Sequence, residues 1–396
     1  MSRPFFRCAR PAPRRCAGVV RALLSFACLS VACFAVGASP ADAARADDAP
    51  ALVAIGARNA TGIALIECRS GRPLALATPP APLAAEPVFA PDGKSLYALA
   101  GAQLLRYQLP ELRELARVTL GYAPTALAAA GGDDAVVMSG GHGPAALSAH
   151  DPVTLAEVQR YRLPEPFSIS ALRDAPARRR FVVAFADLAE AWEIAYGRDA
   201  PPVLQGLVHD YRSGEAVPLP GRFTPRRFEL PGATRALVAG AVPYEVARLD
   251  QAGAFGVVHL DVRREIERPV IAVQPVPDRI VAWRGAARRG WLIAGDGAMD
   301  AEVLEAGAWR VTGRLAVDGA ILALGAAGDR VLVAHQRADG VAVSLVDVSR
   351  GTVEPLATRI APTRPPLQFS AGTGGCVALL ERGQRWLAGF AVPPLR

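Results

Sequence analysis

A weak internal repeat constrains the fold of this chain more than any other feature of its sequence. Short apolar segments that each end in a charged turn recur along the chain at steps of 42, 41, 45, 67, 44, 41 and 42 residues. The segments centre on Leu65, Tyr107, Ser148, Glu193, Leu260, Leu304, Leu345 and Leu387. A second apolar run usually precedes each of them and ends at a Gly- or Asp-rich turn, as in PDGKSLYALAG from Pro91. Repeats of about 40–50 residues that hold several strands and turns are typical of propeller blades.

Eight such units predict an all-β protein, built as one eight-bladed β-propeller with little helix. The one long step is explained by an inserted loop at about residues 197–230. A seven-bladed ring is the alternative, in which one unit beside the insertion is misassigned. Because a ring of blades closes on itself, we expect a monomer.

Residues 1–43 have the features of a secretory signal peptide. The first part of the chain is rich in arginine and has no acidic residue before Asp42. An apolar stretch at 22–38 follows, and Ala41-Asp42-Ala43 supplies the small residues that a signal peptidase requires. Because the stretch is shorter than the roughly 20 residues of a spanning helix, we expect cleavage before Ala44 and no membrane span in the mature chain, residues 44–396. Arg14-Arg15 leaves open whether export uses the general or the twin-arginine route.

Removal of the signal peptide changes the composition from which a function can be predicted. The whole chain has a formal net charge of +7, and the signal peptide contributes six arginines and one aspartate of it, so the mature chain keeps about +2. The remaining arginines are scattered among acidic residues, and no Lys/Arg block of five or more occurs, which argues against nucleic-acid binding. No CxxCH motif is present, so we expect no covalent c-type haem.

Two cysteines, Cys68 and Cys376, remain after the signal peptide is removed. They lie in the first and last units, which a closed ring brings side by side, and an exported protein meets an oxidising environment. The sequence leaves two alternatives open, which are a Cys68–Cys376 disulfide and two buried thiols that never meet.

The inserted region carries the most specific motifs of the chain. Residues 189–231 read AEAWEIAYGRDAPPVLQGLVHDYRSGEAVPLPGRFTPRRFELP, and GVVHLDVRREI follows from Gly256. These segments resemble the cytochrome-d1-type propellers, which include the haem d1 domain of cytochrome cd1 nitrite reductase and relatives in haem d1 biosynthesis. The resemblance is specific over residues 181–266, and elsewhere only the repeat pattern matches. It implies eight blades, a place in the periplasm of a denitrifying bacterium, and a role with haem d1.

A haem d1 site needs residues that the insertion contains. The ring presents several carboxylates around an iron, so its pocket requires arginine donors and an imidazole or phenolate near the metal. We expect His209, with Tyr211 beside it, to act as iron ligand or proton donor, and Arg212, Arg226 and Arg227 to bind carboxylates. Such a loop is expected at the end of the central channel. The alternative is a self-satisfied loop, in which the carboxylate beside His209 pairs with an arginine and Tyr211 packs beneath it.

The chain also departs from the pattern of this family. Relatives that hold haem d1 carry a histidine shortly after the LDVRR strand, where this chain has Gln274–Asp278. Biosynthetic relatives carry a histidine before the first Asp-Gly turn, where this chain has Glu86. With these histidines missing, and without a cytochrome c module, we do not expect direct nitrite reduction.

Two classes of function follow from these features. The first is a cytochrome-d1-like propeller that binds, helps to make or carries haem d1 or a precursor for nitrite reduction, with periplasmic denitrification proteins as partners. The second is a catalytically silent propeller that serves as a periplasmic protein-binding scaffold. Whether the protein turns over a substrate stays open. No HExxH or GxSxG motif is present, which argues against a zinc peptidase or a serine hydrolase.

Overall fold

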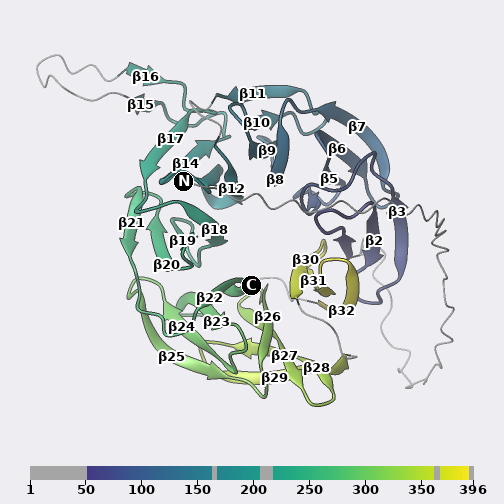
Figure 1. The fold of residues 1–396 in the computed structure, drawn as a ribbon, viewed down its shortest axis with the longest axis vertical. Coiled ribbons are helices and arrows are strands. Elements are labelled where there is room, and N and C mark those ends of the chain that lie inside the picture. Colours follow the sequence, from purple (N-terminus) through teal and green to yellow (C-terminus); the bar gives the residue numbers. More distant parts are fainter. Residues whose placement is uncertain (1–50, 163–166, 206–216, 361–365, 392–396) are drawn as a thin grey trace, which may run out of the picture. The chain divides into compact units, whose positions relative to one another are not determined.

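Repeated antiparallel sheets follow one another around a central channel, and each sheet corresponds to one sequence unit (Figure 1). The computed structural model describes residues 51–162, 167–205, 217–360 and 366–391. The expected signal peptide, residues 1–43, lies outside the described residues. Eight sheets form the ring, which confirms the eight-bladed propeller and rejects the seven-bladed alternative.

The first four blades occupy the chain up to residue 229. Blade 1 contains β1 (Leu52–Ile55), β2 (Ile63–Glu67) and β3 (Pro73–Ala77). Blade 2 contains β4 (Val88–Phe89), β5 (Ser95–Ala100), β6 (Gln103–Gln108) and β7 (Arg113–Thr119). Blade 3 contains β8 (Ala123–Ala130), β9 (Val136–His142), β10 (Leu147–His150) and β11 (Glu157–Tyr161). Blade 4 contains β12 (Ile169–Ala175), β13 (Arg180–Phe185), β14 (Glu190–Ala195) and β17 (Pro225–Glu229).

The other four blades complete the ring. Blade 5 contains β18 (Thr234–Ala239), β19 (Glu245–Asp250), β20 (Phe255–His259) and β21 (Arg264–Glu267). Blade 6 contains β22 (Pro275–Arg284), β23 (Arg289–Gly295), β24 (Asp300–Glu305) and β25 (Arg310–Ala316). Blade 7 contains β26 (Ile321–Ala327), β27 (Arg330–Arg337), β28 (Gly340–Asp347) and β29 (Thr352–Ile360). Blade 8 contains β30 (Leu367–Ala371), β31 (Cys376–Glu381) and β32 (Arg385–Ala391).

Helix is nearly absent, as the sequence predicts. Among the described residues, the one helical segment is a 3-10 turn at Pro176–Arg178. No helix in this part of the chain is long and apolar enough to cross a membrane.

The two faces of each blade pack against different neighbours. In β13, Phe181 and Phe185 join a core cluster shared with blade 3, whereas Val182 and Ala184 join a cluster shared with blade 5. Successive side chains of a strand point to opposite faces of its sheet, so a strand between two blades must be apolar at every position. This explains why β13 is a continuous apolar run rather than an alternating one.

The ring closes through a disulfide between Cys68 and Cys376, whose Cα atoms are 6.3 Å apart. The structure thereby decides between the two alternatives that the sequence leaves open. Thr373 strengthens the junction, because its Oγ1 accepts from the Leu52 backbone N–H at 2.9 Å and its own N–H donates to the Leu52 carbonyl at 2.8 Å. The bond links residues 308 positions apart, and such a crosslink stabilises a fold by about 2–5 kcal/mol.

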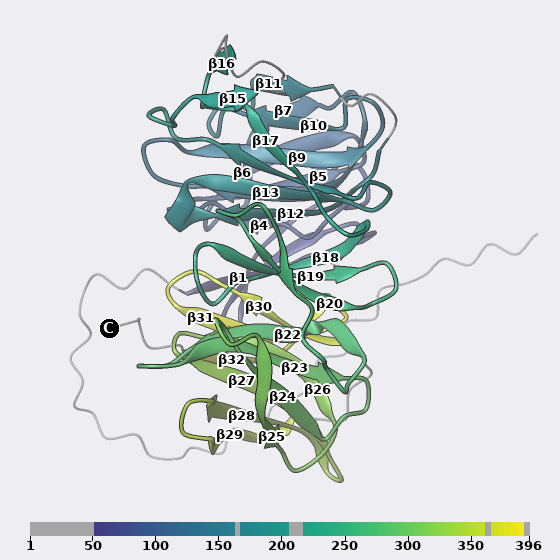
Figure 2. The same cartoon turned by 90° about the vertical axis from the view of Figure 1, so that its left-hand side faces the viewer.

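The insertion lies between β14 and β17 of blade 4. Its described stem is a hairpin of β15 (Val203–Gln205) and β16 (Val217–Leu219). Figure 1 and Figure 2 both place this hairpin at the outer edge of the ring. We expected the insertion at the end of the central channel. Its described stem instead lies at the outer edge of the ring.

Candidate functional site

The innermost strands of five consecutive blades carry a β-bulge near their starts. The residues that interrupt the ladders are Thr125, Ser170, Arg235, the segment 276–279 and Leu322. Bulges redirect side chains and interrupt regular pairing, so one end of the channel is irregular in each of these blades. At the opposite end, where the innermost strands finish, pairing is regular.

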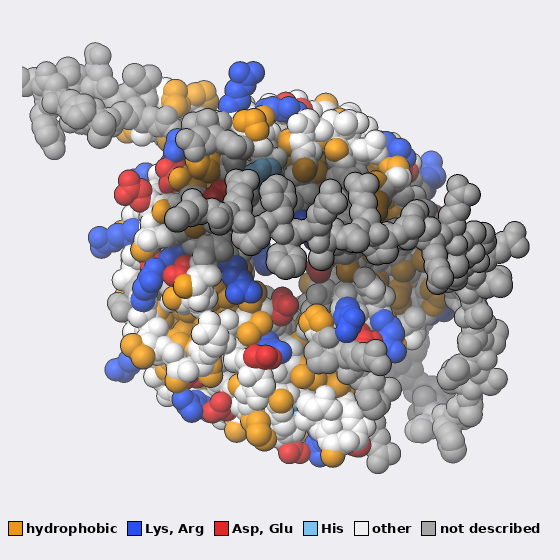
Figure 3. Space-filling view, in the orientation of Figure 1, with side chains coloured by type: hydrophobic (Ala, Val, Ile, Leu, Met, Phe, Trp, Pro, Cys, Tyr) orange, Lys and Arg blue, Asp and Glu red, His pale blue; other side chains and the backbone are white. Residues whose placement is uncertain are grey.

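A cavity of about 410 Å³ lies where β8, β12 and β18 finish. Most of its wall is apolar and includes Leu127, Ala128, Ala129, Leu172, Leu237, Val238 and Val242. Its charged lining residues are Arg173, Asp174, Arg178, Glu245 and Arg284. A cavity of this size, with few polar groups on apolar walls, is typical of a small-molecule site. On the face shown in Figure 3, acidic and basic side chains stand close together near the middle of the ring.

Arg173 is the arginine on which charges from other blades converge. Its Nε donates to the Leu237 carbonyl of blade 5 at 3.3 Å. Although part of the Arg173 side chain is exposed, desolvation by the surrounding residues lowers the pKa of its guanidinium, and the carboxylates of Glu86 in blade 2 and Asp278 in blade 6 act against this shift. Gln368 of blade 8 donates to Glu86 Oε1 at 2.9 Å. Glu86 and Asp278 thus place carboxylates near Arg173 in the segments where the family resemblance leads us to expect histidines.

The two other cavity arginines differ in their partners. Arg178 bonds Glu193 Oε1 at 2.9 Å and Asp261 Oδ1 at 2.8 Å. Arg284, at the end of β22, is exposed and forms no ion pair with any described residue, and neither does Arg173. Arg173 and Arg284 are therefore the cavity cations without an ion pair among the described residues.

Two carboxylic acids in the cavity wall are only partly hydrogen-bonded. Burial raises the pKa of Asp174 to about 6, although a hydrogen bond with Tyr196 acts in the opposite direction. Glu245 is 3% exposed, its Oε1 accepts from the Trp309 indole at 3.2 Å, and burial raises its pKa. Within the described residues, Asp174 Oδ1 and Glu245 Oε2 have no partner. Acids with raised pKa values in a cavity are suited to holding a proton near neutral pH.

The residues that the sequence singles out are spread over two regions. His209, Tyr211 and Arg212 lie outside the described residues. Arg227 lies in β17, the outermost strand of blade 4, and bonds Glu190 through Nη2–Oε1 at 2.8 Å and Nε–Oε2 at 3.1 Å. Arg227 also lies over a Trp side chain of β14, 5.3 Å from the ring centroid. Its contacts in the described structure are those of a residue that holds β17 to β14.

Arg226 also lies in β17, but it lines a small cavity at the rim together with Arg180 and Arg263. The described structure therefore brings neither Arg226 nor Arg227 to the channel cavity. Their assignment to a cofactor stays a prediction.

The described histidines have structural surroundings. His150 is 1% exposed, with Nε2 3.1 Å from both Ser139 Oγ and Ser148 Oγ. A Ser–His pair of this kind suggests a nucleophile and its base, but burial keeps substrate away. His335 is likewise buried, with Nε2 3.1 Å from Ser344 Oγ. Among the described residues, no cluster of His, Cys, Asp and Glu is arranged to hold a metal.

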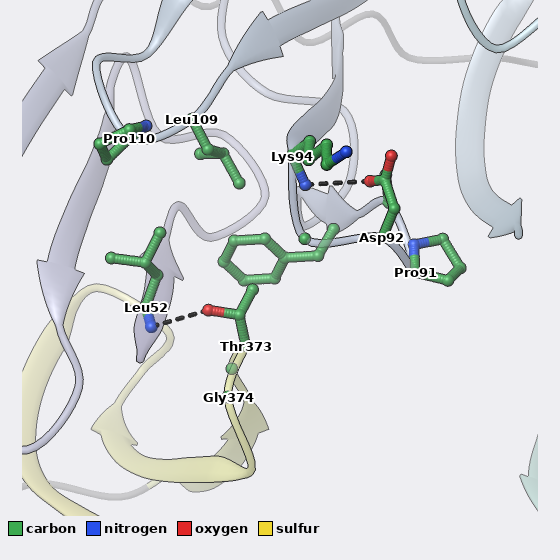
Figure 4. Close-up of a pocket in the computed structure, with 12 residues that line it drawn as sticks. Leu52, Pro91, Asp92, Lys94, Leu109, Pro110, Thr373 and Gly374 are labelled. Carbon is green, nitrogen blue, oxygen red and sulfur yellow. Dashed lines mark hydrogen bonds between the residues drawn. The ribbon is translucent and has the colours of Figure 1, made fainter. Parts of the chain in front are cut away.

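A further cavity, of about 560 Å³, lies beside the ring closure, and two of its polar side chains, Asp92 and Thr373, are already hydrogen-bonded to the backbone (Figure 4). Asp92 Oδ1 accepts from the Lys94 backbone N–H at 2.9 Å, and the Thr373 hydroxyl is bonded to Leu52. These bonds fix a turn and close the ring. This cavity is therefore less suited to a ligand than the one in the channel.

Sequence reasoning missed the channel residues because they occur singly. Arg173 and Asp174 stand in the segment ISALRDA, where an inner strand turns polar as it ends. These strand ends can be assigned to the channel only when the position of each strand within its blade is known. Without that knowledge, the arginine-rich segment around Arg226 and Arg227 is the stronger indication of a ligand site.

Comparison with known proteins agrees with the architecture. A family model described as "Cytochrome D1 heme domain" matches residues 47–331, from before β1 to the start of β27. No curated protein sequence matches closely enough to count as a relative.

Solved structures show the same fold. The structure described as dihydro-heme d1 dehydrogenase NirN in complex with DHE matches with a TM-score of 0.62 and 18% identity, over 83% of this chain and 68% of that one. A computationally designed protein, Ika8, matches with a TM-score of 0.58 and 15% identity, over 87% of this chain and 95% of the other. At these identities the matches establish the propeller architecture alone.

Proposed function

Because this chain belongs to the cytochrome D1 heme domain family, we propose that its channel cavity binds haem d1 or a d1-type precursor in the periplasm. In this proposal the protein handles the ring for nitrite reduction, in a late biosynthetic step or as a carrier. The observation that carries it is the pair Arg173 and Arg284, two cations without ion pairs among the described residues in a cavity whose wall is mostly apolar.

The lining fits a tetrapyrrole in two respects. Apolar walls suit a flat ring, and guanidinium groups bind carboxylates through two parallel hydrogen bonds. Arg173 and Arg284 would hold the carboxylates of the ring, and Asp174 and Glu245 would hold protons beside it. When bound, haem d1 supplies the redox chemistry of its iron.

The iron ligand is a separate part of the proposal. No His, Cys, Met or Tyr is among the described residues that line the channel cavity. His209 remains the proposed iron ligand. Because the β15–β16 stem of the insertion lies at the rim, away from the channel cavity, the role of His209 can be tested separately from that of the cavity. A His209→Ala variant that keeps the spectrum of the bound ring would remove His209 from the proposal without touching the cavity.

The proposed location rests on two observations. Residues 1–43 have the pattern of a signal peptide, and Cys68 and Cys376 form a disulfide, which persists in oxidising compartments. Fractionation of cells that express the full chain should recover the protein in the periplasm, shortened by the signal peptide. A full-length cytoplasmic product would contradict the proposed location.

A protein-binding scaffold is the second candidate. It is favoured by Glu86 and by the segment that contains Asp278, both of which stand where relatives that handle the cofactor carry histidine. A scaffold predicts a specific periplasmic partner whose binding is unchanged in Arg173→Gln, and no spectral response to haem d1.

The test is an absorbance titration of the mature protein with haem d1. We expect saturable band shifts at a stoichiometry of one, and an affinity about 10–100-fold weaker in Arg173→Gln, because a charge-assisted bond contributes about 1.5–3 kcal/mol. Arg58→Gln, at an exposed arginine of blade 1, is the control and should bind like the wild type. No spectral change at stoichiometric haem d1 would overturn the proposal.

A further inference from the structure

A second basic cavity, of about 220 Å³, lies at the junction of blades 4 and 5. Three arginines from three elements line it, which are Arg180 at the start of β13, Arg226 in β17 and Arg263 in the turn before β21. Pro201–Leu204, Ala195 and Gly221 complete the lining. This cavity is separate from the one in the channel, with which it shares no lining residue.

The acidic groups nearby are already occupied. Glu193 is fully buried and accepts from Arg178 Nε at 2.9 Å and from Arg180 Nη1 at 3.0 Å. Asp261 is bonded to Arg178 as well, at 2.8 Å. Among the described residues, Arg226 and Arg263 form no ion pair. The cluster thus holds two more guanidinium groups than carboxylates.

The repulsion within this cluster acts on Arg226 in particular. Burial and the charges of Arg180, Arg263 and Arg178 lower the pKa of its guanidinium, and the nearby Glu193 carboxylate only partly opposes them. A cation held among like charges without a counter-ion is unfavourable. A bound anion would relieve this cost.

The backbone of Arg263 gives independent support. The outer hairpin turns of the blades end on a residue in the left-handed region, which is Gly71, Leu112, Leu155, Arg263, Trp309 or Gly351. Glycine adopts this conformation without cost, whereas other residues are strained by it.

In the other blades that depart from glycine, the side chain has a packing role. Leu112 and Leu155 are buried in core clusters, and the Trp309 indole donates to Glu245. Arg263 is exposed and unpaired among the described residues, yet it has φ of +59°. Packing therefore does not explain the side chain of Arg263.

We propose that Arg180, Arg226 and Arg263 form a binding site for a divalent oxyanion of the phosphate or sulfate class, either free or as the terminal group of a small molecule. Guanidinium groups that approach from three elements suit an anion with several oxygens. The excess of two positive charges matches a dianion, and the cavity volume of about 220 Å³ limits the ligand to a small molecule.

The test is isothermal titration of the mature protein at low ionic strength with inorganic phosphate, sulfate and glycerol phosphate, each compared with chloride at equal ionic strength. We expect saturable binding of phosphate or sulfate that chloride does not reproduce. Tighter binding of glycerol phosphate than of phosphate identifies a phosphomonoester as the ligand, and the reverse order identifies the free anion. Heat signals equal to those of chloride for all three anions would overturn the proposal.

Variants then assign the site. Arg226→Gln and Arg263→Gln should each weaken anion binding at least about tenfold. Arg264→Gln, at the next position, which is also exposed, should leave the affinity unchanged. Affinities of the two site variants equal to the wild type would contradict the site.

Arg263→Gly separates a binding role from a structural one. Glycine relaxes the left-handed backbone, so without anion this variant should melt at or above the temperature of the wild type, and added phosphate should not raise its Tm. A lower Tm without anion would show that Arg263 supports the fold, and would contradict our reading of its backbone.

Discussion

The channel and the outer edge of blade 4 each contain arginines with and without an ion pair. In the channel, Arg173 and Arg284 line a mostly apolar cavity without an ion pair among the described residues, whereas Arg178 is paired. At the edge, Arg227 is committed to Glu190, and Arg226 lies among like charges. The edge carries the conspicuous sequence motif, whereas the channel carries the cavity that suits a tetrapyrrole. Density of arginine in the sequence is therefore a poor guide to which arginines are free to bind a ligand.

The largest expected effect comes from the residue that joins the two regions. Glu193 holds Arg178, which lines the channel cavity, and Arg180, which lines the rim cavity. Glu193→Gln leaves the largely buried Arg180 without a counter-charge and Arg178 with Asp261 alone, so we expect a loss of about 3–5 kcal/mol in the free energy of unfolding. Urea denaturation measures it.

The matched control is on the same strand. Glu190→Gln removes the partner of Arg227, whose side chain is 47% exposed. A loss below about 1 kcal/mol is expected there, because exposed pairs contribute little. Equal losses in Glu190→Gln and Glu193→Gln would contradict the contrast between a buried junction and an exposed edge.

A smaller effect follows from the buried acid of the channel. The pKa of Asp174 is raised to about 6 in the folded protein, above its usual value of about 3.9 in the unfolded chain. The folded state then binds more protons between these values, so stability falls as pH rises from about 4 to about 6.

Asp174→Asn should remove this pH dependence and stabilise the protein by about 2 kcal/mol at pH 7 relative to the wild type. Thermal melts at pH 4, 5, 6 and 7 test this prediction. Two results would contradict the raised pKa of Asp174. One is a wild-type stability that rises from pH 4 to pH 6, and the other is an Asp174→Asn variant with the same pH dependence as the wild type.

The smallest effect is expected on haem d1 binding when an arginine of the edge is replaced. Arg227→Gln should leave haem d1 affinity unchanged within about twofold, because its guanidinium already bonds Glu190 at 2.8 Å. The absorbance titration used for Arg173→Gln measures this. A loss of affinity as large as that of Arg173→Gln would move the site from the channel to the edge.

The repeat predicted the fold because each blade obeys local rules that the sequence displays. Apolar runs such as that of β13 and turns such as Pro91–Lys94 recur at a fixed spacing, so eight blades could be counted. The pairing of Cys68 with Cys376 could be named as an alternative but not decided, since ring closure fixes the distance between them.

The channel site could not be predicted in the same way. Arg173, Glu86 and Asp278 lie far apart in the chain, and only the ring brings their charges to bear on one another. Arg227 shows the converse case. Its motif suggests that it binds a ligand carboxylate. In the structure, Arg227 pairs with Trp192 across the ladder between β14 and β17, and its guanidinium bonds Glu190. Whether an arginine has an ion-pair partner depends on its neighbours in three dimensions, which the sequence alone does not reveal.

A crystal structure of the mature protein with haem d1 would locate the bound ring. We expect electron density for the ring in the channel cavity, with its carboxylates at Arg173 and Arg284. Density for the ring at the edge of blade 4, beside Arg226 and Arg227, would contradict this expectation.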